Sequence, residues 1–121
     1  MALILIIDDD DLFRAMLRQM LETEGYEVVD APDGKEGTRL YRAKPTDLII
    51  TDIVMPDKEG IEIIRELRGD FSEVKVIGIS GKGCVGPDNS LKIAKRLGAQ
   101  FTFEKPFQRK ELLEAVRESL K

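Results

Sequence analysis

The sequence contains no histidine. Without an imidazole, the chain has no Ser-His-Asp or Cys-His catalytic group, no histidine metal ligand and no histidine to carry a phosphoryl group. Any chemistry in this protein must therefore use carboxylates, hydroxyls, lysine or the backbone. This absence narrows the possible functions more than any other feature of the composition.

Cysteine is nearly absent, since Cys84 is the only one in the sequence. A single cysteine cannot form an intrachain disulfide, and nothing in the sequence indicates an oxidising compartment. Long apolar runs are also missing, because no stretch approaches the about 20 residues that a membrane span needs. The apolar start, MALILII, lacks the basic residues of a secretion signal and runs into Asp8, so it predicts a buried strand. We expect a cytoplasmic protein without a membrane segment.

An excess of basic residues is missing as well. The 19 Lys and Arg residues are outnumbered by 23 Asp and Glu residues, which gives a net charge of −4. Direct binding of nucleic acid is not expected, because phosphate contacts need clustered basic side chains. The 121 residues, of which 42% are hydrophobic, suffice for one globular domain, which we place at residues 1–121.

Apolar runs alternate with helical patterns along the whole chain. The run from Leu3 to Ile7 is typical of a strand buried on both faces. The first helix is predicted to begin after Asp10 as N-cap and to stop at Gly25. Its expected apolar face is Leu12, Phe13, Met16, Leu17, Met20 and Leu21. The strands are predicted at residues 3–7, 26–29, 48–51, 74–79 and 101–103, and the later helices at residues 33–43, 58–67, 89–97 and 108–120.

This alternation predicts an α/β fold with a five-stranded parallel sheet and helices on both faces. In such sheets, functional residues collect where the strands deliver their carboxyl ends. The polar residues that follow four of the strands are Asp8 with Asp9, Asp52, Ser80 and Lys105. We therefore expect three carboxylates, a hydroxyl and an ammonium group at one edge of the sheet.

Crowded carboxylates repel one another, and a divalent cation would stabilise them. Carboxylate oxygens suit Mg²⁺, or Mn²⁺ in its place. An aspartate can act as a nucleophile and form an acyl phosphate, whose oxygens Ser80 and Lys105 could stabilise. The chain lacks the histidine that would donate the phosphoryl group, which fits a protein that receives phosphate from a partner.

These residues resemble the receiver domains of response regulators in two-component signalling, in particular the single-domain chemotaxis regulators. The resemblance spans the chain, and four segments carry it: LILIIDDD, DLIITDIVMP, VKVIGISG and FEKPF. It implies the flavodoxin-like strand order 2-1-3-4-5. It also implies a phosphoprotein that catalyses only its own phosphorylation and dephosphorylation, and so is not an enzyme in the usual sense.

The resemblance also implies a role for each site residue. Asp52 resembles the phospho-acceptor, Asp9 the direct Mg²⁺ ligand, and Asp8 a ligand through water. Val54 resembles a ligand through its backbone carbonyl. Among the remaining residues, Ser80 matches the switch hydroxyl, Lys105 the conserved-type lysine, and Pro106 the proline that follows it.

The partners implied by the resemblance are a sensor histidine kinase or a histidine phosphotransfer protein, and a downstream protein target. A monomer or weak dimer is expected. The last predicted helix reaches the end of the sequence, which leaves no room for an output domain. A free regulator, a phosphate relay and a piece of a longer chain all stay open.

Two features depart from the family pattern. Thr102 stands where the family usually has Tyr or Phe, and the strand geometry predicts that Phe101 and Phe103 point to the opposite face. The loop after Ser80 contains Gly81, Gly83 and Gly86 in the spacing of a dinucleotide fingerprint. Its place in the chain argues against that function, and we interpret it as a loop that rearranges on phosphorylation.

Three other functions agree less well with the sequence. A dehalogenase-type phosphatase would need an acid two residues after its nucleophile, where this chain has Val54. A receiver-like interaction module that has lost phosphorylation would usually lack one of the acids or the lysine, and all are present. A nucleotide-binding flavodoxin relative is disfavoured because acids crowd the expected site.

Overall fold

The computed structural model describes residues 2–53, 60–80, 95–96, 98–105 and 107–121. Its centre is a five-stranded parallel sheet in the order β2-β1-β3-β4-β5. This confirms the predicted fold class and strand order. The strands are β1 (Leu3–Ile7), β2 (Glu27–Ala31), β3 (Leu48–Asp52), β4 (Val76–Ser80) and β5 (Phe101–Glu104).

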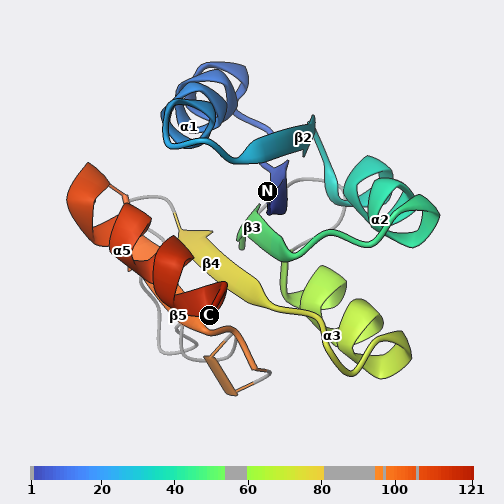
Figure 1. The fold of residues 1–121 in the computed structure, drawn as a ribbon. Helices are drawn as coiled ribbons and strands as arrows, with labels where there is room; N and C mark the ends of the chain where they lie inside the picture. The colour runs from blue at the N-terminus through green and yellow to red at the C-terminus, as the bar shows by residue number, and fades with distance from the viewer. Residues whose placement is uncertain (1, 54–59, 81–94, 97, 106) are drawn as a thin grey trace.

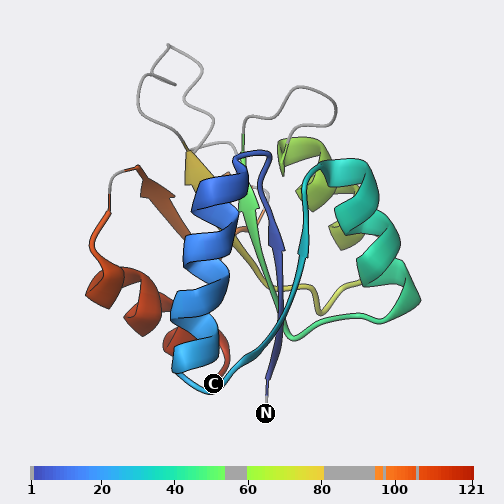
Figure 2. The ribbon, with the colours of Figure 1, turned by 90° about the horizontal axis from the view of Figure 1, so that it is seen from above.

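Helices cover both faces of the sheet, as Figures 1 and 2 show. The α1 and α5 helices lie on one face, and the α2 and α3 helices lie on the other. Their bounds are α1 (Asp11–Thr23), α2 (Gly34–Ala43), α3 (Gly60–Asp70) and α5 (Arg109–Ser119). Of the helix expected at residues 89–97, only Lys95 and Arg96 lie among the described residues, and both are helical.

The sheet separates two hydrophobic cores because successive side chains of a strand point to opposite faces. Ile4 and Ile6 of β1 belong to the core under α1 and α5, whereas Leu5 and Ile7 belong to the core under α2 and α3. All four are buried. Burial on both faces explains why β1 is an uninterrupted apolar run in the sequence.

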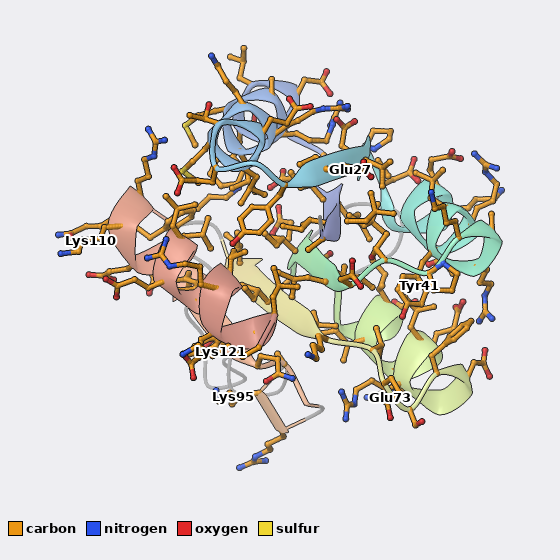
Figure 3. The ribbon with its side chains drawn as sticks, in the orientation of Figure 1. Glu27, Tyr41, Glu73, Lys95, Lys110 and Lys121 are labelled. Carbon is orange, nitrogen blue, oxygen red and sulfur yellow. The ribbon has the colours of Figure 1, made fainter. Side chains whose placement is uncertain are left out.

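An aromatic pair joins α2 to the residue that follows α3. Tyr41 lies on the side of α2 that faces α3 (Figure 3). Its ring meets Phe71 edge-on, with the ring centroids 5.1 Å apart. The charged end of Lys110 on α5, by contrast, points away from the sheet (Figure 3).

The predicted apolar face of α1 is partly wrong. Leu17, Met20 and Leu21 are buried, but Leu12 is 85% exposed and Met16 is 52% exposed. The six apolar positions form two adjacent rows on the helix, and only the row of Phe13, Leu17 and Leu21 faces the sheet squarely. Leu12 and Met16 belong to the other row, which points outward over the first two turns.

Both ends of α1 agree with the prediction. The side chain of Asp10 accepts hydrogen bonds from the backbone N–H groups of Leu12 and Phe13, which makes it the N-cap. After the helix, Gly25 has φ +94°, a conformation that favours glycine and ends the helix. Among the described residues, the structure has no helix of the length and apolarity that a membrane crossing requires.

Candidate functional site

Three carboxylates meet at the carboxyl ends of β1 and β3. Asp8 and Asp9 follow β1, and Asp52 is the last residue of β3. One carboxylate oxygen from each lies within 4.8 Å of the others. Asp8 and Asp52 are buried, with 1% and 7% of their surface exposed, whereas Asp9 is exposed. The predicted acid cluster is therefore present, with Asp8 and Asp52 buried and Asp9 at the surface.

Hydrogen bonds to neighbouring backbone groups fix the position of Asp8. The N–H of Asp8 donates to the carbonyl of Ala31 on the neighbouring strand, over 3.2 Å. The carboxylate of Asp8 accepts from the N–H of Asp10, over 2.8 Å. Because Asp10 in turn caps α1, the position of Asp8 is tied to the start of that helix.

Arg14 of α1 binds the backbone of the segment between β1 and α1. Its Nη1 donates to the carbonyl oxygen of Asp8 over 2.6 Å. Its other nitrogens form ion pairs with Asp11 at 2.7 Å and with Asp30 at 3.4 Å. The sequence prediction missed Arg14, because a single arginine in an amphipathic helix is indistinguishable from an ordinary surface charge.

Lys105 brings a positive charge to the cluster from the far end of the chain. Its Nζ lies 3.2 Å from Oδ2 of Asp8 and 4.0 Å from Oδ2 of Asp52. Only 20% of its side chain is exposed. The ammonium thus lies between the two buried carboxylates, as their placement at the strand ends predicts.

Ser80 completes the set at the end of β4. It is buried, and its carbonyl accepts a hydrogen bond from the N–H of Lys105 over 2.7 Å. This backbone contact fixes Lys105 relative to the end of β4. Val54 and Pro106, which the sequence assigns to the same site, lie outside the described residues.

The donor set fits a hard divalent cation. Three carboxylate oxygens that converge from two strand ends are the ligands that Mg²⁺ prefers, and Mg²⁺ typically keeps several waters besides. No histidine or thiolate lies among the three groups, which disfavours the softer transition metals.

A family model described as the response regulator receiver domain matches residues 4–117. The chain belongs to this family. It is 32% identical to the chemotaxis protein CheY of Halobacterium salinarum over 118 residues, which is 97% of this chain and 95% of that protein. It is also 32% identical to the CheY of Bacillus subtilis, covering 97% of this chain and 96% of that one. A crystal structure of a receiver domain protein from Clostridium thermocellum has a TM-score of 0.90 at 30% identity, covering 99% of this chain and 94% of that one.

Thr102, where the resemblance leads us to expect Tyr or Phe, lies within β5 of the receiver. Phe101 and Phe103 both pack against the core under α1 and α5, and Thr102 between them is half-buried. Because side chains alternate along β5, Thr102 points to the other face. Neither phenylalanine of β5 therefore takes the place of a ring at position 102.

Gly60 lies directly against the end of β3 in the receiver. Its N–H donates to the carbonyl of Ile53 over 2.9 Å, which joins the start of α3 to the residue after β3. A Cβ atom on Gly60 would lie 2.3 Å from the carbonyl oxygen of Asp52. The glycine therefore lets α3 begin next to Asp52, a role that the sequence prediction missed.

Burial in the receiver raises the pKa of Asp8 above its ordinary value of 3.8, although the N–H of Asp10 and the ammonium of Lys105 counteract part of this effect. The unfolded chain keeps the ordinary pKa, so the folded chain binds the Asp8 proton more tightly. The protonated Asp8 adds to the free energy of unfolding. This contribution is fully present below pH 3.8 and is lost as the pH rises through the folded-state pKa. At neutral pH, the ionised Asp8 therefore opposes folding.

We expect Asp8→Asn to stabilise the metal-free receiver by about 1 kcal/mol at pH 7, because the substitution removes a buried charge from a functional site. This corresponds to a rise of about 4 °C in the midpoint of thermal unfolding. The rise should shrink as the pH falls through the raised pKa of the wild-type Asp8 carboxyl, where that group takes up its proton. Thermal unfolding followed by circular dichroism with EDTA, at a series of pH values, measures both effects.

The matched control is Asp10→Asn, which keeps an equally good N-cap and removes a more exposed charge. Its unfolding midpoint should stay close to that of the wild type. Destabilisation by Asp8→Asn would show instead that the ion pair with Lys105 outweighs the burial of the carboxylate.

Proposed function

We propose that this receiver accepts a phosphoryl group on Asp52 and that the modification changes its affinity for a protein target. The observation that carries the proposal is the position of the Lys105 ammonium, 3.2 Å from Asp8 and 4.0 Å from Asp52, beside three convergent carboxylates. A nucleophilic carboxylate, an acidic pocket for a cation and a fixed positive charge are together what an aspartyl phosphate requires.

The phosphoryl donor in this proposal is the phosphohistidine of a sensor kinase or of a histidine phosphotransfer protein. A carboxylate oxygen of Asp52 forms a bond to phosphorus while the bond from phosphorus to the donor nitrogen breaks. The electron pair of the broken bond stays on the donor imidazole, which then takes up a proton. Because residues 1–121 contain no histidine, a phosphohistidine donor lies outside them.

Asp8, Asp9 and Asp52, with the backbone carbonyl of Val54, are the proposed ligands of Mg²⁺ or Mn²⁺. A bound cation supplies positive charge that offsets the repulsion between the carboxylates and the phosphoryl oxygens. Asp9 and Asp52 are assigned as direct ligands, and Asp8 as a ligand through water.

Lys105 and Ser80 are the proposed stabilisers of the phosphorylated state. The Lys105 ammonium can pair with a phosphoryl oxygen without leaving the site, because its backbone is fixed to Ser80. The Ser80 hydroxyl can donate a hydrogen bond to another phosphoryl oxygen, and movement of Ser80 would carry the signal into the following loop. That loop lies outside the described residues.

Incubation with acetyl phosphate and Mg²⁺ tests the proposal. Intact-mass spectrometry should show the addition of one phosphoryl group, and EDTA should prevent it. Hydroxylamine should remove the group, because it cleaves acyl phosphates and leaves serine phosphate intact. An unchanged mass, or a phosphoryl group that resists hydroxylamine, would contradict the assignment to an aspartate.

A further inference from the structure

The ammonium of Lys105 has a third neighbour besides the two carboxylates. Its Nζ lies 3.9 Å from the centroid of the Phe13 ring. Phe13 belongs to the first turns of α1, whereas Lys105 follows β5. The contact therefore joins the start of α1 to the segment that follows β5.

The position of the ammonium depends on what surrounds it. The backbone of Lys105 is fixed by the hydrogen bond to Ser80, but four flexible carbons separate that backbone from Nζ. Aspartate carboxylates attract the ammonium, but with no further neighbour it could turn toward water. The Phe13 ring occupies a position against it instead.

The Phe13 ring is itself held in place. The N–H of Phe13 donates to the side chain of Asp10 over 3.1 Å, which fixes the backbone at the helix start. The ring meets Phe107 edge-on, with centroids 5.9 Å apart. Phe107 in turn contacts Phe103 of β5 at 5.7 Å. The three rings form a connected cluster, the aromatic cluster, which links α1 to the segment between β5 and α5.

The face of an aromatic ring carries negative electrostatic potential and attracts a cation placed over it. At 3.9 Å the ammonium lies well within the range of this attraction. The ring has no lone pair that could accept a conventional hydrogen bond. The N–H groups of the ammonium therefore stay available to the carboxylates. An aliphatic side chain of similar volume would fill the space but would not attract the charge.

We propose that Phe13 is a positioning residue for Lys105 and that its ring holds the ammonium where the phosphoryl group on Asp52 will need it. This inference rests on the proposed function. The ring makes no contact with the phosphoryl group, and it acts only through the lysine. Preorganisation of the ammonium before the reaction increases the rate, because no reorientation is then needed in the transition state.

The test compares Phe13→Leu with Phe13→Trp in the reaction with acetyl phosphate and Mg²⁺. Phe13→Leu keeps an apolar side chain but removes the ring, and we expect the phosphorylation rate to fall about fivefold. Phe13→Trp keeps an aromatic face and should restore most of the rate. The matched control is Phe101→Leu, which removes a ring of β5 that lies outside the aromatic cluster, and it should leave the rate within about twofold of wild type.

A double-mutant cycle separates positioning from a merely structural role. In the background of Lys105→Met, which lacks the ammonium, Phe13→Leu should have no further effect on the rate. The ring should also shift the ε-methylene NMR signals of Lys105 upfield in the unphosphorylated wild type, and this shift should vanish in Phe13→Leu. Circular dichroism verifies that each variant is folded.

The outcomes distinguish the two proposals. If the wild type is phosphorylated and Phe13→Leu reacts equally fast, the inference about Phe13 is wrong and the proposed function stands. The same conclusion follows if Phe13→Leu slows the reaction equally with and without the lysine. If the wild type takes no phosphoryl group, the proposed function fails and the positioning role fails with it.

Discussion

Asp52→Asn is expected to abolish the addition of a phosphoryl group from acetyl phosphate. The substitution keeps the shape of the side chain but replaces the nucleophilic carboxylate by an amide, whose oxygen is far less nucleophilic. Asp52 is 7% exposed and ends a strand that is buried throughout, so the amide should be held in the same place. Intact-mass spectrometry should show the unmodified mass after a time in which the wild type is fully converted. We expect a loss of at least about 1,000-fold in rate, the scale seen when a nucleophile is removed.

The control for this variant is Asp11→Asn, in the same run of four acidic residues. The side chain of Asp11 is 83% exposed, and its carboxylate pairs with Arg14 rather than joining the cluster. This variant should be phosphorylated to the same extent as the wild type. Equal modification of Asp52→Asn would mean that the phosphoryl group is accepted elsewhere.

Gly60→Ala is expected to destabilise the fold by about 2 kcal/mol and to slow phosphorylation as well. The added methyl group would lie 2.3 Å from the carbonyl oxygen of Asp52 and 2.8 Å from the Cα of Ile53. Both neighbours are backbone atoms, so relieving this clash requires a shift of α3 or of the backbone at Asp52 and Ile53. Urea unfolding measures the loss of stability, and the reaction with acetyl phosphate measures the displacement of Asp52.

Gly69→Ala in the same helix is the matched control. Among the described residues, no side chain and no backbone outside the neighbouring turns of α3 lies within 4 Å of the position that its Cβ would take, apart from the adjoining residues of the chain. Because alanine loses less conformational entropy than glycine in a helix, this variant should be more stable by about 0.5–1 kcal/mol and should react at the wild-type rate. If both variants were stabilised alike, the close approach of α3 to Asp52 would be refuted.

The sheet and the acid cluster could be predicted because both follow from one simple pattern. Apolar runs such as Leu3–Ile7 have the length of a strand. They lack the alternation of apolar and polar residues that a half-exposed strand would show, so they predict strands buried on both faces. Parallel strands then bring the residues after them to a common edge, which places Asp8, Asp52 and Lys105 together without further information. The structure agrees, with Nζ of Lys105 between the two carboxylates.

Features that depend on contacts between elements could not be predicted. The apolar pattern of α1 gives two rows of equal hydrophobicity, and only packing against the sheet decides that Phe13 faces inward and Leu12 outward. For the same reason, the sequence gives no sign that Phe13 meets Lys105, since 3.9 Å is a property of the docked helices. Gly60 likewise looks like any loop glycine until the carbonyl of Asp52 is seen beside it.

The contact between Lys105 and Asp8 joins residues that are 97 positions apart. During synthesis, the ribosome makes the acids of β1 and β3 long before it makes β5. A nascent chain at that stage has the proposed nucleophile, Asp52, but lacks the ammonium that should stabilise its phosphorylated form. Only a molecule whose last strand has joined the sheet brings the charges together. Under the proposed function, competence to receive a signal is coupled to the completion of folding, and a truncated or half-made copy should be a poor competitor for the donor's phosphoryl groups.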